Sequence, residues 1–200
     1  MKIIGLTGGI GSGKSTVSSY LEKKGCKILD CDMISRKMTE KGSPALEKIR
    51  QQFGSEYFLS DGTLDRKALG DFVFNNRSQL DVLQKIITEK VIEHINNTIS
   101  YLKDYQFEGI IVIDAPLLFE CGMENIADEN WLVTASIDTR LERVSKRDGL
   151  SKEQILLRIN NQMPEEEKEK LSNCVLDNST DLDELFNQID MNLERINNEY

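Results

Sequence analysis

An apolar run that leads directly into a glycine-rich loop most constrains the fold of this chain. Residues 2–7 read Lys-Ile-Ile-Gly-Leu-Thr, and residues 8–15 read Gly-Gly-Ile-Gly-Ser-Gly-Lys-Ser. The second stretch fits the phosphate-loop pattern G-x-x-x-x-G-K-[ST] at each fixed position. The residues from Ser15 onward predict a helix that ends at Gly25. A strand, a glycine loop and a helix in this order predict an α/β fold that binds a nucleotide.

The residue types in this loop suit a phosphate ligand. Glycines let the backbone turn sharply and point several N–H groups at one anion. The helix that follows adds its partial positive charge, Lys14 can reach the outer phosphates, and the Ser15 hydroxyl can ligate magnesium. A glycine turn without a ligand is the alternative, but the complete motif favours a nucleotide. The predicted nucleotide-binding residues here are Gly8, Gly9, Ile10, Gly11, Ser12, Gly13, Lys14, Ser15 and Thr16.

Charge and hydropathy limit the partners of the chain. Its 200 residues are enough for one domain with a core. A formal net charge of −9 disfavours nucleic-acid binding, which needs a basic surface. The apolar run at 110–113 is far too short to cross a membrane. The chain also opens directly into a predicted strand, so we expect a cytoplasmic protein. We expect it to bind neither nucleic acid nor membrane, and to be a monomer or a small homo-oligomer.

The cysteine and histidine inventory disfavours a zinc site. Cys26, Cys31, Cys121 and Cys174 form no C-x-x-C pair, and His94 is the single histidine. We expect the cysteines to be buried or inert, His94 to lie on a helix surface, and Trp131 to belong to the core.

The order of predicted elements indicates a parallel sheet with crossover helices. After the first strand, further strands are predicted at 26–30, 109–114, 131–137 and 174–176. A helix is expected at about 33–41, and another begins near Pro44. Residues 65–105 have a continuous helical pattern that breaks the strand–helix alternation and therefore indicates an insertion. Residues 138–170 predict two charged helices broken at 147–150, and a last helix runs from Asp181.

Polar residues collect where the predicted strands end. The phosphate loop and residues 30–32, 114–120 and 138–147 all follow strands. Ligands of parallel sheets bind at the carboxyl ends of the strands, so these segments are predicted to converge on one site.

Two carboxylates in these segments each allow two interpretations. Asp32 could face the transferred phosphoryl group, taking a proton or holding magnesium through water. It could equally cap the helix that follows it. Asp114 could act as a Walker-B carboxylate, or it could simply end its strand, because Pro116 follows two residues later.

Three arginines share one face of a predicted helix. Arg140, Arg143 and Arg147 are spaced by three and four residues. Surface ion pairs would explain them, since most charge clusters are solvated. An acidic protein that binds phosphates nevertheless needs local cations, and guanidinium groups stabilise transferred phosphoryl charge. We therefore favour a functional role for Arg143 and Arg147, and less so for Arg140.

Several further stretches together resemble the dephospho-coenzyme A kinase family. The resemblance begins with Gly5-Leu6-Thr7 and the phosphate loop, and continues through Asp30-Cys31-Asp32 and Pro116-Leu117-Leu118-Phe119-Glu120. It then covers Arg143, Arg147-Asp148-Gly149-Leu150, Arg158-Ile159, Gln162-Met163-Pro164 and Asp177-Asn178-Ser179. The segments span nearly the whole chain in the family's order.

This resemblance implies an activity and a set of roles. The family transfers the γ-phosphate of ATP to the 3′-hydroxyl of the dephospho-CoA ribose, the last step of coenzyme A synthesis. Carried over, Asp32 matches the carboxylate that faces the acceptor hydroxyl, and Arg143 and Arg147 match lid arginines that act with Lys14. Asn178 would lie on the adenine side, Leu117 and Glu120 beside the acceptor, and Ser15 on magnesium, with Asp32 reaching the ion through water.

The resemblance also implies a fold and its parts. It is the P-loop type: a five-stranded parallel sheet between helices, with a helical insertion and a helical lid. The expected core is 1–60, 107–138 and 171–200, the acceptor-binding insertion about 61–106, and the lid about 139–170. Many relatives carry His-Pro where this chain has Thr88-Glu89, so the family's acceptor contacts are not carried over to that segment.

Other classes of phosphate-loop protein remain as alternatives. A GTPase should show D-x-x-G and N-K-x-D, and neither occurs in this sequence. A kinase of another small molecule, such as a nucleoside monophosphate or shikimate, and an ATPase without an acceptor would both keep the loop.

Overall fold

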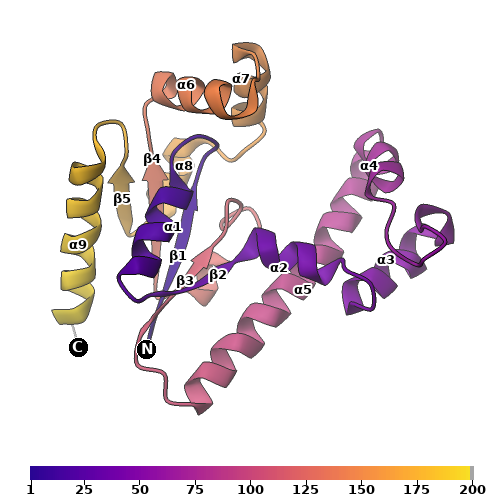
Figure 1. Ribbon diagram of the computed structural model, residues 1–200, viewed down its shortest axis with the longest axis horizontal. Helices are drawn as coiled ribbons and strands as arrows, with labels where there is room; N and C mark the ends of the chain where they lie inside the picture. The colour runs from indigo at the N-terminus through magenta and orange to yellow at the C-terminus, as the bar shows by residue number, and fades with distance from the viewer. Residues whose placement is uncertain (199–200) are drawn as a thin grey trace. The chain divides into compact units, whose positions relative to one another are not determined.

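A five-stranded sheet is the framework of the α/β part of the protein. The computed structural model, shown in Figure 1, describes residues 1–198. The strands are β1 (Lys2–Gly8), β2 (Lys27–Asp30), β3 (Ile110–Asp114), β4 (Glu129–Thr134) and β5 (Cys174–Asp177). Their order is β2-β3-β1-β4-β5, and β1 pairs in parallel with both β3 and β4. The α/β fold with a five-stranded sheet, predicted from the sequence, is confirmed.

The chain divides into two compact units. The first consists of residues 1–29 and the described residues from 107 onward. Its helices are α1 (Lys14–Lys23), α6 (Ile137–Asp148), α7 (Lys152–Asn160), α8 (Glu165–Leu171) and α9 (Leu182–Asn198), with a short 3-10 turn η2 (Glu124–Ile126).

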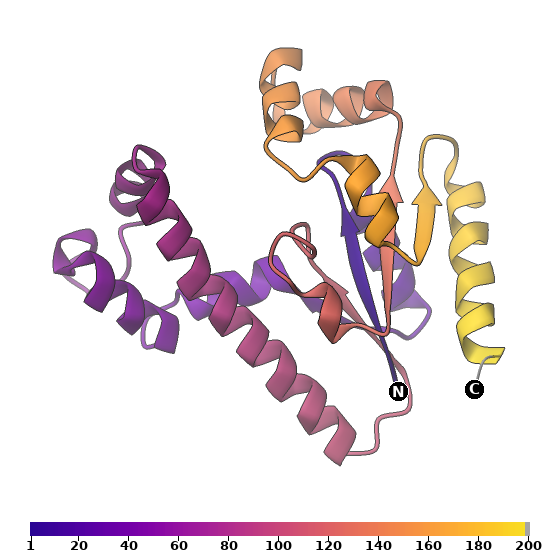
Figure 2. The same cartoon turned by 180° about the vertical axis from the view of Figure 1, so that it is seen from behind.

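Apolar side chains of alternate strand positions build the core of the first unit. In β1, Ile4 and Leu6 point to the face that is covered by α1 and α9. These two helices lie side by side in Figure 1. Trp131 of β4 is fully buried in the same cluster, as predicted. Figure 2 shows α8 beside the sheet, where it packs on β4. The core therefore fixes the strand ends that carry the phosphate loop.

The second unit is helical and spans residues 30–106. It contains α2 (Cys31–Met38), α3 (Pro44–Phe53), a 3-10 turn η1 (Ser55–Tyr57), α4 (Arg66–Phe74) and α5 (Arg77–Asp104). Helices α2, α3 and α4 each pack on α5. Ile49, Phe53, Leu69 and Val73 form its buried cluster. This unit begins at Asp30, whereas the sequence places the start of the insertion at about 61.

Two predicted boundaries are wrong. The strand expected at 131–137 ends at Thr134, because the Ser136 side chain accepts a hydrogen bond from the Thr139 N–H and starts α6. Residues 138–170 contain three helices rather than two, since a further break at Pro164 separates α7 from α8. Residues 161–164 read Asn-Gln-Met-Pro and carry no charge, and Pro164, a residue type that stops a helix, was the sequence signal for this break. No described helix is both long and apolar enough to cross a membrane.

Candidate active site

The phosphate loop joins β1 to α1 and has the backbone that its glycines permit. Gly11 and Gly13 have φ angles of +80° and +95°, which side chains with a Cβ rarely adopt. A Cβ at Gly13 would also collide with the side chain of Asn178. Ser15 is exposed in the first turn of α1, and Thr16 is half-buried beside it. Glycine is thus required here for both conformation and space.

The lysine of the loop is paired with a buried carboxylate. Lys14 Nζ forms an ion pair with Asp114 at the end of β3, and their side chains are 17% and 8% exposed. The sequence left Asp114 open between a Walker-B carboxylate and an ordinary strand end. Its carboxylate proves to neutralise Lys14, so an incoming phosphate would compete with Asp114 for the ammonium group.

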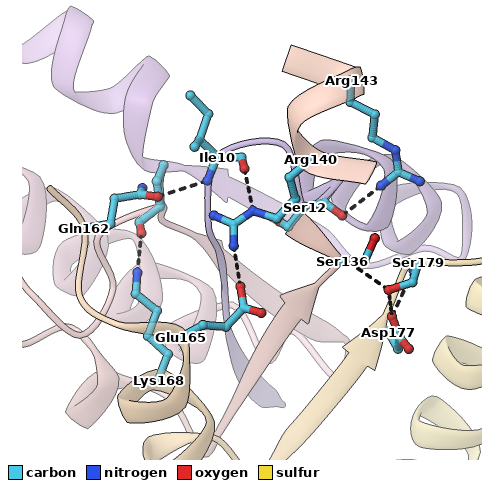
Figure 3. Close-up of polar contacts among 11 residues, drawn as sticks. Ile10, Ser12, Ser136, Arg140, Arg143, Gln162, Glu165, Lys168, Asp177 and Ser179 are labelled. Atoms are coloured by element: carbon cyan, nitrogen blue, oxygen red, sulfur yellow. Dashed lines mark hydrogen bonds and ion pairs between the residues drawn. The ribbon is translucent and has the colours of Figure 1, made fainter. Parts of the chain in front are cut away.

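Side chains from two distant segments hold the Ser12 carbonyl. Asn178 Nδ2 donates to it at 2.7 Å, and Arg143 Nη1 donates to it at 3.4 Å (Figure 3 draws the arginine contact). Arg143 Nη2 also donates to the Asn178 carbonyl at 3.0 Å. The resemblance assigns Asn178 to the adenine side. In the structure its side chain is buried, and the contacts above are to the loop backbone and to Arg143.

Arg140 makes closer contacts with the loop than its two neighbours on α6. Its Nε donates to the Ile10 carbonyl at 2.9 Å, and its Nη1 lies 2.7 Å from Glu165 Oε2 of α8 (Figure 3). Gln162 Oε1 accepts from the Ile10 N–H at 3.0 Å. Burial raises the pKa of Glu165, and the Arg140 charge opposes that rise. From the sequence, Arg140 ranked last among the three arginines of this helix. Its spacing placed it on their shared face, but nothing in the sequence indicated its contacts with Ile10 and Glu165.

A buried lysine that sequence reasoning missed holds the segment after β3. Lys168 of α8 is 1% exposed and lies 2.8 Å from Glu120 Oε1. It also donates to the Pro116 carbonyl at 3.3 Å. Glu120 additionally accepts from the Met163 N–H, while Leu117 is exposed. Lys168 stands in the run Glu-Glu-Glu-Lys-Glu-Lys, where nothing in the sequence distinguishes it from a surface lysine.

The residue that caps α2 is Asp30, the last residue of β2, and not Asp32. The Asp30 side chain accepts from the Met33 N–H at 2.9 Å at the start of α2. Asp32 lies in the first turn of that helix and is exposed. The interpretation of Asp32 as a helix cap is therefore wrong, and its carboxylate is available for another role.

Arg147, the last arginine of the α6 face, is mostly solvated. Its side chain is 63% exposed and forms two hydrogen bonds with the carboxylate of Asp148, at 2.8 and 2.9 Å. This bidentate pair raises the pKa of Arg147 and lowers the pKa of Asp148. Of the three arginines, Arg140 and Arg143 contact the loop, and Arg147 contacts its sequence neighbour.

Three of the four cysteines are buried, and Cys121 is partly buried. Cys26, Cys31 and Cys174 are buried, and burial raises the pKa of the Cys26 and Cys174 thiols to about 11. His94 is exposed on α5. Within residues 1–198, no three His, Cys, Asp or Glu side chains gather as a metal cluster would require.

Comparisons with known proteins agree with this geometry. The sequence profile of the dephospho-CoA kinase family matches residues 2–184. The chain belongs to that family. A dephospho-CoA kinase of Carboxydothermus hydrogenoformans is 44% identical over 94% of this chain and 91% of its own length. A dephospho-CoA kinase of Fusobacterium nucleatum is 39% identical over 97% of this chain and 98% of its own length.

Solved structures of similar proteins share the fold. A dephospho-CoA kinase from Campylobacter jejuni superposes with a TM-score of 0.71 at 26% identity, covering 97% of this chain and 96% of its own. The Thermus thermophilus protein TT1252 gives a TM-score of 0.81 at 36% identity, with 97% of each chain covered. The predicted family is confirmed, and as a member of it the protein is a phosphotransferase.

For this family member we predict that Arg147→Ala lowers turnover about a hundredfold or more, as expected when a guanidinium acts on transferred phosphoryl charge. Arg147→Lys should restore little, because an ammonium lacks the planar fork. Steady-state kinetics test this, with Lys146→Ala, an exposed cation of the same helix, as the matched control. Full activity in the lysine variant would reduce Arg147 to the surface partner of Asp148.

Proposed function

We propose that the protein uses ATP and magnesium to phosphorylate the 3′-hydroxyl of the dephospho-CoA ribose, releasing coenzyme A and ADP. The observation that carries this proposal is a complete phosphate loop, with Lys14 held on Asp114, in a chain whose family match covers residues 2–184. The loop supplies the nucleotide site, and the family match supplies the acceptor.

The residues of the loop fit a triphosphate. The N–H groups of Gly11 and Gly13 donate no hydrogen bond within residues 1–198, and the first turn of α1 adds its positive end. Lys14 would leave Asp114 for the β- and γ-phosphates. The exposed Ser15 hydroxyl suits magnesium, a hard cation that prefers oxygen ligands. When bound, the ion would neutralise part of the phosphate charge.

Each of the proposed catalytic side chains has a role in the phosphoryl transfer. Asp32 would accept the proton of the acceptor hydroxyl, or orient that hydroxyl and a magnesium-bound water. The acceptor oxygen then forms a bond to the γ-phosphorus as the bond to ADP breaks. Lys14 and Arg143 would stabilise the charge that develops, together with Arg147.

The parts of the chain that would meet the acceptor follow from the family resemblance. We propose that Leu117 and Glu120 contact dephospho-CoA, that the insertion at about 61–106 binds it, and that residues 139–170 act as the lid. We further propose a cytoplasmic enzyme, a monomer or small homo-oligomer, which acts on this small molecule and not on nucleic acid.

A coupled ADP-release assay over a short acceptor panel tests the proposal. The panel contains dephospho-CoA, AMP, shikimate and no acceptor. We expect ADP release to require dephospho-CoA, and mass spectrometry of the isolated coenzyme to show one added phosphate, whose 3′ position proton–phosphorus NMR would establish. Preferred turnover of AMP or shikimate would identify another small-molecule kinase, and equal release without an acceptor would identify an ATPase.

A further inference from the structure

Both backbone polar groups of Ile10, in the middle of the phosphate loop, are held by side chains from outside the loop. The Ile10 carbonyl accepts from Arg140 Nε at 2.9 Å, and its N–H donates to Gln162 Oε1 at 3.0 Å. Arg140 comes from α6, and Gln162 comes from the connection between α7 and α8. Figure 3 shows the two side chains reaching Ile10 from either side.

Peptide geometry links these contacts to the direction of the loop N–H groups. In a planar trans peptide the carbonyl and the following N–H point in opposite directions. Holding the Ile10 carbonyl on Arg140 therefore turns the Gly11 N–H to the other side of the loop. The Ser12 carbonyl, held by Asn178 and Arg143, turns the Gly13 N–H in the same manner.

The loop needs these contacts because its glycines restrict the backbone conformation very little. The peptide between Ile10 and Gly11 borders a glycine at φ +80°, a residue type that populates both signs of φ. If that peptide turned over, a carbonyl oxygen in place of an N–H would face the triphosphate. The preceding peptide, between Gly9 and Ile10, is held through both of its polar groups: its carbonyl accepts from the Ser12 N–H at 3.1 Å, and its N–H donates to Gln162.

The environment of Arg140 suits a positioning role. The residue is 5% exposed, and its Nη1 is paired with Glu165 at 2.7 Å. Its Nη2 lies over Gly9, where a Cβ would approach it to 2.5 Å. Charge-assisted hydrogen bonds in such a buried place are stronger than exposed ones. The ion pair with Glu165 fixes the orientation of the Arg140 guanidinium, so that its Nε points at the loop.

We infer that Arg140 and Gln162 are positioning residues that clamp Ile10 and so hold the Gly11 N–H in the direction that binds the triphosphate. This Ile10 clamp rests on the proposed function, because it assumes that ATP occupies the loop. Both residues belong to the α6–α8 segment, so the clamp also ties the orientation of the loop to that segment.

Arg140→Met and Gln162→Met test the clamp, since methionine keeps a similar length but offers neither group. We expect each variant to raise the dissociation constant of a non-hydrolysable ATP analogue by about tenfold to a hundredfold, the cost of a buried charged or neutral hydrogen bond. The KM for dephospho-CoA should change little. Arg140→Lys should restore part of the affinity, because one ammonium cannot serve both Ile10 and Glu165.

A second measurement needs neither ATP nor acceptor. Hydrogen exchange of the Ile10 amide, followed by NMR on the nucleotide-free protein, should become at least about tenfold faster in Gln162→Met, because its acceptor is lost. Lys170→Ala, an exposed cation on α8, is the matched control and should leave both affinity and exchange unchanged.

The double variant Arg140→Met with Glu165→Gln separates the clamp from the ion pair. It removes the uncompensated Glu165 charge, so it should regain stability while its ATP affinity stays as low as that of Arg140→Met. Recovery of affinity in the double variant, or wild-type affinity in both single variants, would overturn the clamp. Failure of the proposed function appears differently, as absent dephospho-CoA turnover in the wild-type protein.

Discussion

Lys14→Ala is expected to abolish phosphoryl transfer, lowering turnover by about a thousandfold or more, because the ammonium group stabilises charge on the β- and γ-phosphates. The structure adds a second consequence. Removal of Lys14 leaves the Asp114 carboxylate buried without its ion-pair partner. An unpaired buried charge is strongly destabilising, so the melting temperature should also fall.

Asp114→Asn in the Lys14→Ala background distinguishes the two effects. The amide has the shape of the carboxylate and carries no charge, so the double variant should regain much of the lost stability. It should still not transfer phosphate, because the cation is missing. The measurements are thermal melting and the dephospho-CoA turnover assay. Near-wild-type turnover in either variant would mean that the phosphate-loop assignment is wrong.

Asp32→Asn is expected to lower turnover by about two orders of magnitude or more, with ATP affinity little altered. Asparagine cannot take the proton of the acceptor hydroxyl, nor can it offer a full negative charge to magnesium-bound water. Stability should change little, because Asp32 is exposed and the cap of α2 is Asp30. Parallel melting, ATP-binding and turnover measurements test this expectation.

Asp30→Ala is the matched structural control. Loss of an N-cap costs about 0.5–2 kcal/mol, which lowers the melting temperature of a domain of this size by roughly 1–8 °C. We expect this variant to melt earlier but to keep most of its turnover below the transition. If Asp32→Asn melts and turns over normally, then Asp32 has no catalytic role, and positioning by Lys14 and the arginines must carry the transfer.

Much of the fold and the core of the site could be predicted from local sequence patterns. The glycine spacing of residues 8–15 specified both a turn and an anion site, because both depend on backbone conformations within a few residues. The apolar runs that became β1 and β3 were predicted to within a residue, since burial on both faces of a parallel sheet leaves a continuous signal. The roles assigned to Asp32, Arg147, Leu117 and Glu120 stay predictions.

Capping was predicted less well because neighbouring residues compete for it. Two aspartates stand at the start of α2, and composition does not say which one accepts from the Met33 N–H. Similarly, Ser136 lies in a stretch typical of a strand, yet its side chain begins α6. The start of such a helix depends on which of several neighbouring residues is the last to have non-helical backbone angles, and the sequence alone does not determine this.

The sequence by itself determined that this chain folds around a strand, a phosphate loop and a helix, and it identified the family through motifs that keep their order. Only the tertiary structure decided which side chains hold that loop. Arg140 meets Ile10 across 130 residues, Asn178 meets Ser12 across 166, and Lys14 meets Asp114 across 100. Helical spacing can place a side chain on a face, but which partner it meets depends on how the sheet brings distant segments together.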